Sequence, residues 1–61
     1  MINSHLKNDI RYITINRADK ANAITTEMLD ELIKIVSQSY KNKAMIISGS
    51  GLVFSAGADL D

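Results

Sequence analysis

The fold is decided by the stretch Ala44-Met45-Ile46-Ile47-Ser48-Gly49-Ser50-Gly51-Leu52-Val53-Phe54-Ser55-Ala56-Gly57-Ala58-Asp59-Leu60. Its first part, Ala44–Ser48, is apolar without polar alternation, as expected of a parallel strand that is covered on both faces. The glycines and small residues that follow leave backbone N–H groups bare, in what looks like a turn from a strand into a helix. Exposed amides at such a turn can hold a negatively charged oxygen as it forms.

The residues before this stretch predict a strand, a helix and their connections. Lys7–Asp9 is expected to be a turn between two extended pieces, and Ile10–Ile15 is rich in β-branched and aromatic residues, so it is expected to be a strand. Thr25 can cap a helix from Thr26 to Tyr40, which Asn42-Lys43 should end. One helical face gathers the apolar residues Met28, Leu29, Leu32, Ile33, Val36 and Tyr40. The order strand, helix, strand predicts one crossover unit of an α/β sheet, which cannot cover both faces of its own sheet.

Composition narrows the class of protein. The chain has 61 residues, so it forms at most one small domain, and it has no cysteine, so neither a disulfide nor a thiolate metal site is possible. The formal net charge is zero, without the clustered Lys and Arg of a nucleic-acid site. No apolar run is long enough for a membrane helix, and the N-terminus does not resemble a secretory signal, so we expect a soluble cytoplasmic protein.

Phosphate-binding and nucleophile motifs do not fit the glycine-rich run. A dinucleotide fingerprint from Gly49 would need glycine where Phe54 stands, and the spacing of the later glycines does not match a Walker loop. A nucleophile elbow around Ser55 would need glycine where Val53 stands, so Ser55 is interpreted as a small residue that lets the turn close.

A few polar residues have two interpretations each. Asp59 and Asp61 could be metal ligands, but a charge pair at a helix N-terminus is the more common role of such a spacing. Lys20 is by default a solvated loop lysine, and alternatively a phosphate contact. The single histidine, His5, is interpreted as a solvated residue at a strand edge.

Two segments carry a family resemblance. One runs from Ile13 through Asn16-Arg17 and Lys20-Ala21-Asn22-Ala23 to Ile24, and the other runs from Gly49 to Leu60 and contains Phe54-Ser55-Ala56-Gly57-Ala58-Asp59. In this order, with a helix between them, they resemble the enoyl-CoA hydratase/isomerase (crotonase) superfamily over nearly the whole chain, from about Ile10 to Asp61. The chain departs from the family at Ala18, where proline usually follows Asn-Arg, which loosens the loop but removes no functional group.

The resemblance implies an α/β fold of the crotonase-like (ClpP/crotonase) type, a spiral of β-β-α units of which only the first strand–helix–strand portion is present. Residues 1–61 would be the truncated N-terminal part of one such domain. The implied function is that of an enoyl-CoA hydratase in fatty-acid oxidation, which adds water across the 2,3 double bond of an acyl-CoA thioester through an enolate. Enoyl-CoA isomerases and other acyl-CoA enzymes of the superfamily share these segments and remain alternatives.

The resemblance also assigns site residues. The backbone N–H of Ala58 matches the first of two oxyanion-hole donors. The residues that match positions around CoA and its thioester are Lys20, Ala21, Ala23, Ala56, Gly57, Ala58, Asp59, Leu60 and Asp61. No metal or redox cofactor is implied, coenzyme A being part of the substrate, and intact members are usually homotrimers or hexamers.

The remaining catalytic groups of the family lie beyond Asp61, namely the second oxyanion donor and the acid–base glutamates. Glu27 and Glu31 lie on the predicted helix, which we expect to be remote from the turn, so the 61-residue chain alone should have no hydratase activity. A hypothesis of another class is a small non-catalytic binding module or partner-dependent subunit, and a third possibility is that the sequence is part of a longer chain.

Overall fold

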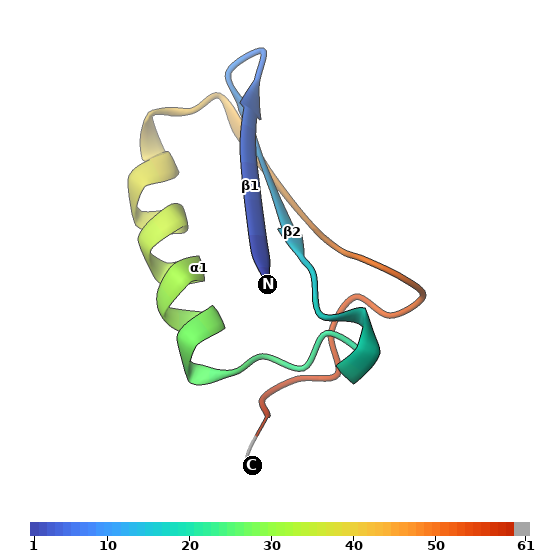
Figure 1. The fold of residues 1–61 in the computed structure, drawn as a ribbon. Helices are drawn as coiled ribbons and strands as arrows, with labels where there is room; N and C mark the ends of the chain where they lie inside the picture. Colours follow the sequence, from blue (N-terminus) through green and yellow to red (C-terminus); the bar gives the residue numbers. More distant parts are fainter. Residues whose placement is uncertain (60–61) are drawn as a thin grey trace.

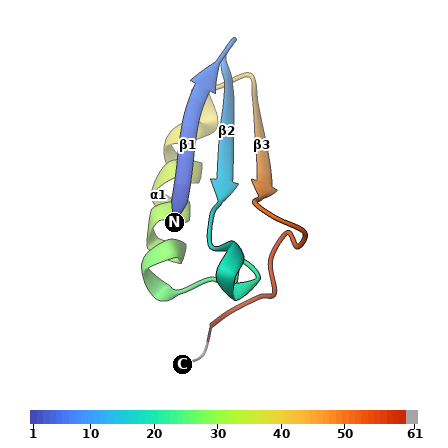
Figure 2. The same ribbon diagram turned by 45° about the vertical axis from the view of Figure 1, so that its right-hand side comes forward.

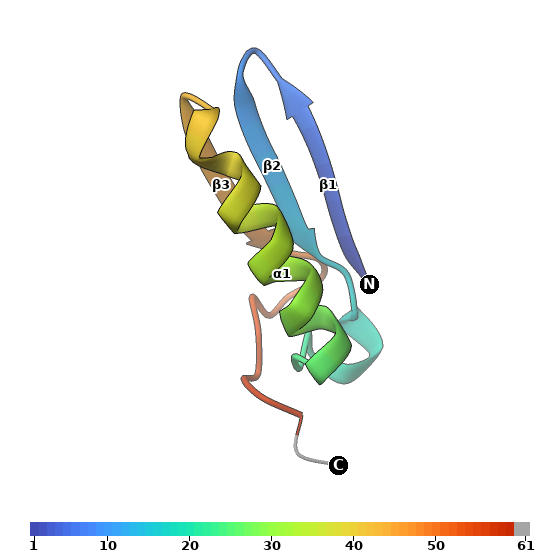
Figure 3. The ribbon, with the colours of Figure 1, turned by 90° about the vertical axis from the view of Figure 1, so that its left-hand side faces the viewer.

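The computed structural model describes residues 1–59, in which a three-stranded sheet and one α-helix form two layers (Figure 1). The strands lie side by side in the order β1-β2-β3 (Figure 2), and α1 lies across one face of the sheet (Figure 3). The elements are β1 (Ile2–Lys7), β2 (Ile10–Ile15), a 3-10 helix (Ala18–Lys20), α1 (Thr26–Gln38), a second 3-10 helix (Ser39–Lys41) and β3 (Ala44–Gly49).

The hairpin between β1 and β2 confirms the predicted turn. Asn8 and Asp9 have φ angles of 53° and 63°, which is the left-handed backbone that a two-residue turn between antiparallel strands requires. Asn and Asp adopt this region more easily than most residues because their side chains bond locally. The resulting register places Ile2 opposite Ile15.

Helix α1 begins where the sequence predicts and ends earlier. The Thr25 hydroxyl accepts a hydrogen bond from the Met28 N–H at 3.1 Å, as an N-cap does. The predicted helix continues to Tyr40, whereas the α-helix ends at Gln38. The reason lies in Ser39, whose hydroxyl donates to the Ile35 carbonyl at 2.6 Å while its backbone N–H bonds to Val36, so the helix tightens into a 3-10 turn.

Strand β3 is parallel to β2, as predicted, with Ile10 aligned with Ala44 and Ile15 with Gly49. The expected cover on both faces of β3 is not provided by residues 1–59. Met45, Ile46 and Ile47 are 40%, 46% and 41% exposed. A lone crossover helix covers only one face of a sheet, and in this chain it leaves β3 open on that face as well.

The core lies between α1 and the β1–β2 hairpin. Its buried apolar residues are Ile2, Ile13, Ile15 and Met28, with Ile24, Leu32 and Ile35 packed around them. The single apolar helix face that the sequence predicts is therefore divided in two. The other half is an exposed stripe made of Leu29, Ile33 and Val36 of α1 and continued by Tyr40 of the 3-10 helix that follows.

Within residues 1–59, no helix is long and apolar enough to cross a membrane.

The burial of Met28 leads to a stability prediction. Its side chain is fully buried, so Met28→Ala should lower the free energy of unfolding by about 2–5 kcal/mol through lost packing and a residual cavity. Glu31→Ala, at an exposed position of the same helix, is the control and should change it by less than about 0.5 kcal/mol. Urea denaturation measures both, and equal losses would show that Met28 is not part of the core.

Candidate functional site

The two segments that carry the family resemblance lie side by side. Beyond β3 the chain turns back and runs along the loop that precedes α1 (Figure 1). The Ala56 N–H donates to the Ala21 carbonyl at 2.9 Å, and Ile24 and Ala58 form an isolated parallel bridge. The predicted helix after the turn does not begin within the described residues, where the last stretch forms only the bridge at Ala58.

Asn22 joins these segments, and sequence reasoning missed it. Its side chain is fully buried, and its Nδ2 donates to the Ser50 and Val53 carbonyls at 2.7 and 2.6 Å. Its Oδ1 accepts from the Arg17 N–H at 2.8 Å, so both ends of the amide are satisfied. Asn22 and the preceding residue Ala21, which is one of the predicted CoA-binding residues, both have a left-handed backbone conformation, with φ of 57° and 51°. The only signal in the sequence was an asparagine between two small residues.

Glycine is required at two positions of this site. A Cβ at Gly49 would overlap the Phe54 carbonyl oxygen and lie 2.8 Å from the Phe54 Cα and 2.9 Å from the Asn22 Nδ2. Only glycine lets the chain approach this closely. Gly57 has open space around it, but its φ of 101° is a conformation that side chains disfavour.

The bridge to Ile24 does not use the backbone N–H of Ala58. In the bridge, Ile24 donates to the Gly57 carbonyl at 2.7 Å and Asp59 donates to the Ile24 carbonyl at 2.8 Å. Because extended backbone alternates its direction, the N–H of Ala58 itself points away from Ile24. No described residue accepts a hydrogen bond from it. Its role as an oxyanion donor stays a prediction.

Ala58 also lines a hollow of about 400 Å³. The hollow is lined by Ile24, Thr25, Thr26, Leu29, Gly57, Ala58 and Asp59. The sequence analysis expected the helix to be remote from the turn, but the start of α1 lies beside it. Glu27 and Glu31 are exposed on the helix and do not line the hollow.

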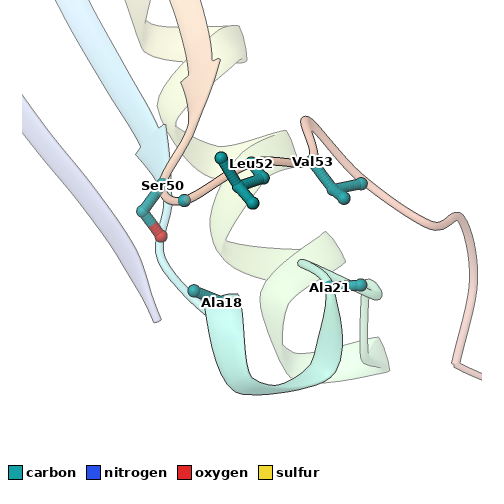
Figure 4. Close-up of a pocket in the computed structure, with 6 residues that line it drawn as sticks. Ala18, Ala21, Ser50, Leu52 and Val53 are labelled. Carbon is teal, nitrogen blue, oxygen red and sulfur yellow. The ribbon is translucent and has the colours of Figure 1, made fainter.

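The predicted CoA-binding loop lies beside a second, smaller hollow of about 290 Å³. The hollow is lined by Ala18, Ala21, Ser50, Gly51, Leu52 and Val53. Figure 4 shows Ala18 and Ala21 on the turn opposite the loop that carries Ser50, Leu52 and Val53. Lys20 is exposed at the end of the 3-10 helix, and Ala23 is half-buried.

Asp59 takes part in an ion pair that the sequence did not predict. Its Oδ2 lies 2.7 Å from Arg17 Nη1, which also donates to the Ala23 carbonyl at 3.0 Å. Asp59 is thus not at the N-terminus of a helix within the described residues. Of the other predicted site residues, Ala56 is exposed, and Leu60 and Asp61 lie outside the described residues.

Ser55 has the role of a small turn residue that its position suggested. Its hydroxyl donates to the Asn22 carbonyl at 2.9 Å and accepts from the Gly57 N–H at 3.1 Å.

Within residues 1–59, no group of three or more His, Asp or Glu side chains could hold a metal ion.

Replacing Asn22 tests its role in joining the two segments. Asn22→Asp removes the Nδ2 donor and sets a buried carboxylate against the Ser50 and Val53 carbonyls, so it should cost about 3 kcal/mol of unfolding free energy. Hydrogen exchange at the Ala56 amide should also accelerate. The control Asn3→Asp makes the same change at an exposed position of β1, and equal stability of the two variants would contradict the role.

Comparisons with known proteins identify the family and the fold. Residues 5–61 match the family described as enoyl-CoA hydratase/isomerase. An enoyl-CoA hydratase/isomerase from Pseudoalteromonas atlantica has the same fold, with a TM-score of 0.92 and 32% identity over 98% of this chain and 25% of that chain. Another from Xanthobacter autotrophicus gives a TM-score of 0.87 and 34% identity over 97% of this chain and 23% of that one.

A curated relative carries a different name. The small ribosomal subunit protein mS47 of Schizosaccharomyces pombe is 40% identical over 57 residues, which is 88% of this chain and 13% of that protein. The chain thus spans about a quarter of the length of the solved structures and a smaller part of this relative. With its three strands, crossover helix and glycine turn, the chain belongs to the enoyl-CoA hydratase/isomerase family and has the N-terminal portion of the crotonase fold.

Proposed function

We propose that this chain supplies the first oxyanion donor and part of the CoA-binding loop of an acyl-CoA enzyme. The observation that carries the proposal is the Ala58 N–H, which has no acceptor among the described residues and belongs to a residue that lines a hollow. A fixed backbone donor of this kind can polarise a thioester carbonyl and stabilise the enolate formed on it. Such a donor contributes on the order of 3 kcal/mol to transition-state stabilisation in other enzymes.

The reaction that we propose is hydration of the 2,3 double bond of an enoyl-CoA. The enolate oxygen would be held at Ala58, with coenzyme A carried along the loop that contains Lys20, Ala21 and Ala23. Because isomerases of the family stabilise the same enolate, the donor alone does not distinguish the two reactions. The acid–base groups and the second donor belong, in this proposal, to further parts of the fold, and no metal or redox cofactor takes part.

We further propose, by analogy with the family, a cytoplasmic homotrimer or hexamer. In this proposal the ammonium group of Lys20, which is exposed on the loop, contacts a phosphate of CoA. The 61-residue chain alone should show no hydratase activity, and detectable turnover by it would contradict this part of the proposal.

A second candidate function is a non-catalytic, partner-dependent subunit. Two observations favour it: a relative named as a small ribosomal subunit protein, and the exposed apolar stripe of α1. Binding of a short enoyl-CoA by calorimetry, measured together with its turnover, separates the two. Binding without turnover by the full-length protein would favour the second candidate over the enzyme, and no binding would remove the first.

Proline at position 58 tests the oxyanion donor directly. Ala58→Pro removes the backbone N–H, which has no protein acceptor among the described residues, so no structural hydrogen bond is lost with it. In the full-length protein, kcat for hydration should fall roughly 100- to 1,000-fold. The loss of the enoyl thioester's ultraviolet absorbance measures this rate.

Ala58→Ser is the matched control, since it changes the side chain and keeps the N–H. It should retain activity within about threefold if the side chain matters only sterically. Thermal unfolding of both variants checks that they fold. A folded Ala58→Pro variant with the activity of Ala58→Ser would show that this amide is not the donor.

A further inference from the structure

The guanidinium of Arg17 links the two segments of the chain that meet beside Ala58. Arg17 Nη1 donates to the Ala23 carbonyl at 3.0 Å on one side and to Asp59 Oδ2 at 2.7 Å on the other. The side chains of Arg17 and Asp59 are only 17% and 21% exposed. Partial burial strengthens such a charge-assisted hydrogen bond, because water screens it less.

The Arg17 contacts lie beside the two backbone hydrogen bonds that join Ile24 to Gly57 and to Asp59. The bridge between Ile24 and Ala58 is isolated, so the hydrogen bonds of Ile24 and Asp59 have no continuing ladder beside them. Gly57, directly before Ala58, has a φ of 101°, and its carbonyl accepts from the Ile24 N–H at 2.7 Å. This carbonyl and the Ala58 N–H belong to the same planar peptide group, so the hydrogen bond to Ile24 sets the direction of that N–H. If the two segments separated at Ile24, this peptide group could rotate at Gly57 and turn the Ala58 amide away from its present direction.

We infer that Arg17 is a positioning residue, which holds the Asp59 carboxylate and thereby fixes the direction of the Ala58 N–H. The inference rests on the proposed function, because it gives that amide its task. Arg17 does not touch the thioester in this scheme. It acts through Asp59, whose backbone N–H bonds to Ile24 and whose carboxylate bonds to Arg17, so that one residue is held at both ends.

A different role for Asp59 makes different predictions. The family resemblance places Asp59 among residues around CoA, where its loss would raise KM and leave Arg17 uninvolved. If Asp59 acts with Arg17, then Arg17→Met and Asp59→Asn should both lower kcat at nearly constant KM. Their combination should lower it no further than Arg17→Met alone, since both remove one interaction.

The experiment measures these variants in the full-length protein. Arg17→Met should lower kcat roughly 10- to 100-fold, as expected when a catalytic group is displaced by about 1 Å. Arg17→Lys, which keeps the charge, should recover part of the loss. Arg11→Met is the matched control, because the Arg11 side chain donates to the exposed Ser4 hydroxyl at 3.2 Å, away from the site, and it should leave kcat unchanged.

Two readouts separate positioning from general loss of stability. Infrared spectroscopy of the bound thioester reports only on folded, loaded protein, and Arg17→Met should reduce the downward shift of the carbonyl frequency. Amide hydrogen exchange at Ile24 and Asp59 should accelerate in the same variant. Unchanged exchange would overturn the inference, and so would faster exchange with an unchanged carbonyl frequency and kcat.

Failure of the proposed function would be visible without any variant. If the wild-type protein binds no short enoyl-CoA, the oxyanion role fails, and the positioning role fails with it. If the wild type binds and turns over the thioester while Arg17→Met behaves as Arg11→Met does, only the inference about Arg17 is overturned.

Discussion

The site depends on the side-chain amide of Asn22. Its Nδ2 donates to the carbonyls of Ser50 and Val53, and its Oδ1 accepts from the backbone of Arg17, all without contact with solvent. A buried amide that lost these partners would keep its desolvation cost and gain nothing in return, so the loop and the glycine-rich segment are stable only together. Gly49 is the steric counterpart of this interaction, since a Cβ there would occupy the space of the Phe54 backbone and the Asn22 amide.

Apolar packing stabilises the hairpin and α1, whereas polar contacts stabilise the loop and the glycine-rich segment. Ile13 and Met28 are part of the core that holds the hairpin and α1 together. The parallel pairing of β2 and β3 places the C-terminal ends of both strands at the same edge of the sheet. Beyond that edge there is almost no apolar burial, and hydrogen bonds take over. The direction of the Ala58 amide therefore depends on polar contacts, namely the hydrogen bonds of Ile24 to Gly57 and Asp59 and that of Arg17 to Asp59.

Local features of the sequence predicted secondary structure and strand pairing. The strand Ile10–Ile15, the Thr25 cap and the parallel pairing follow from residue type and spacing, and all are confirmed. The helix end was predicted too late because a serine hydroxyl at Ser39 competes with the backbone, which periodicity does not reveal. The partners of Asn22 and Arg17 lie up to 42 residues away, so no local pattern could have identified them, although the family resemblance named their neighbours. The site residues assigned by that resemblance stay predictions.

Ala18 stands where the family usually has proline, and this difference affects the backbone conformation of Arg17. Proline at position 18 would restrict the residue before it to an extended backbone, with ψ of about 120° to 160°. Arg17 instead has a ψ of 51°, with φ at −141°. Alanine therefore leaves Arg17 a conformation that a following proline disfavours, and from this conformation its guanidinium reaches both Ala23 and Asp59. Ala18 also begins a 3-10 helix, where a missing N–H would remove no hydrogen bond of the described structure. The replacement thus bears on the freedom of the Arg17 backbone rather than on the hydrogen bonding of the loop.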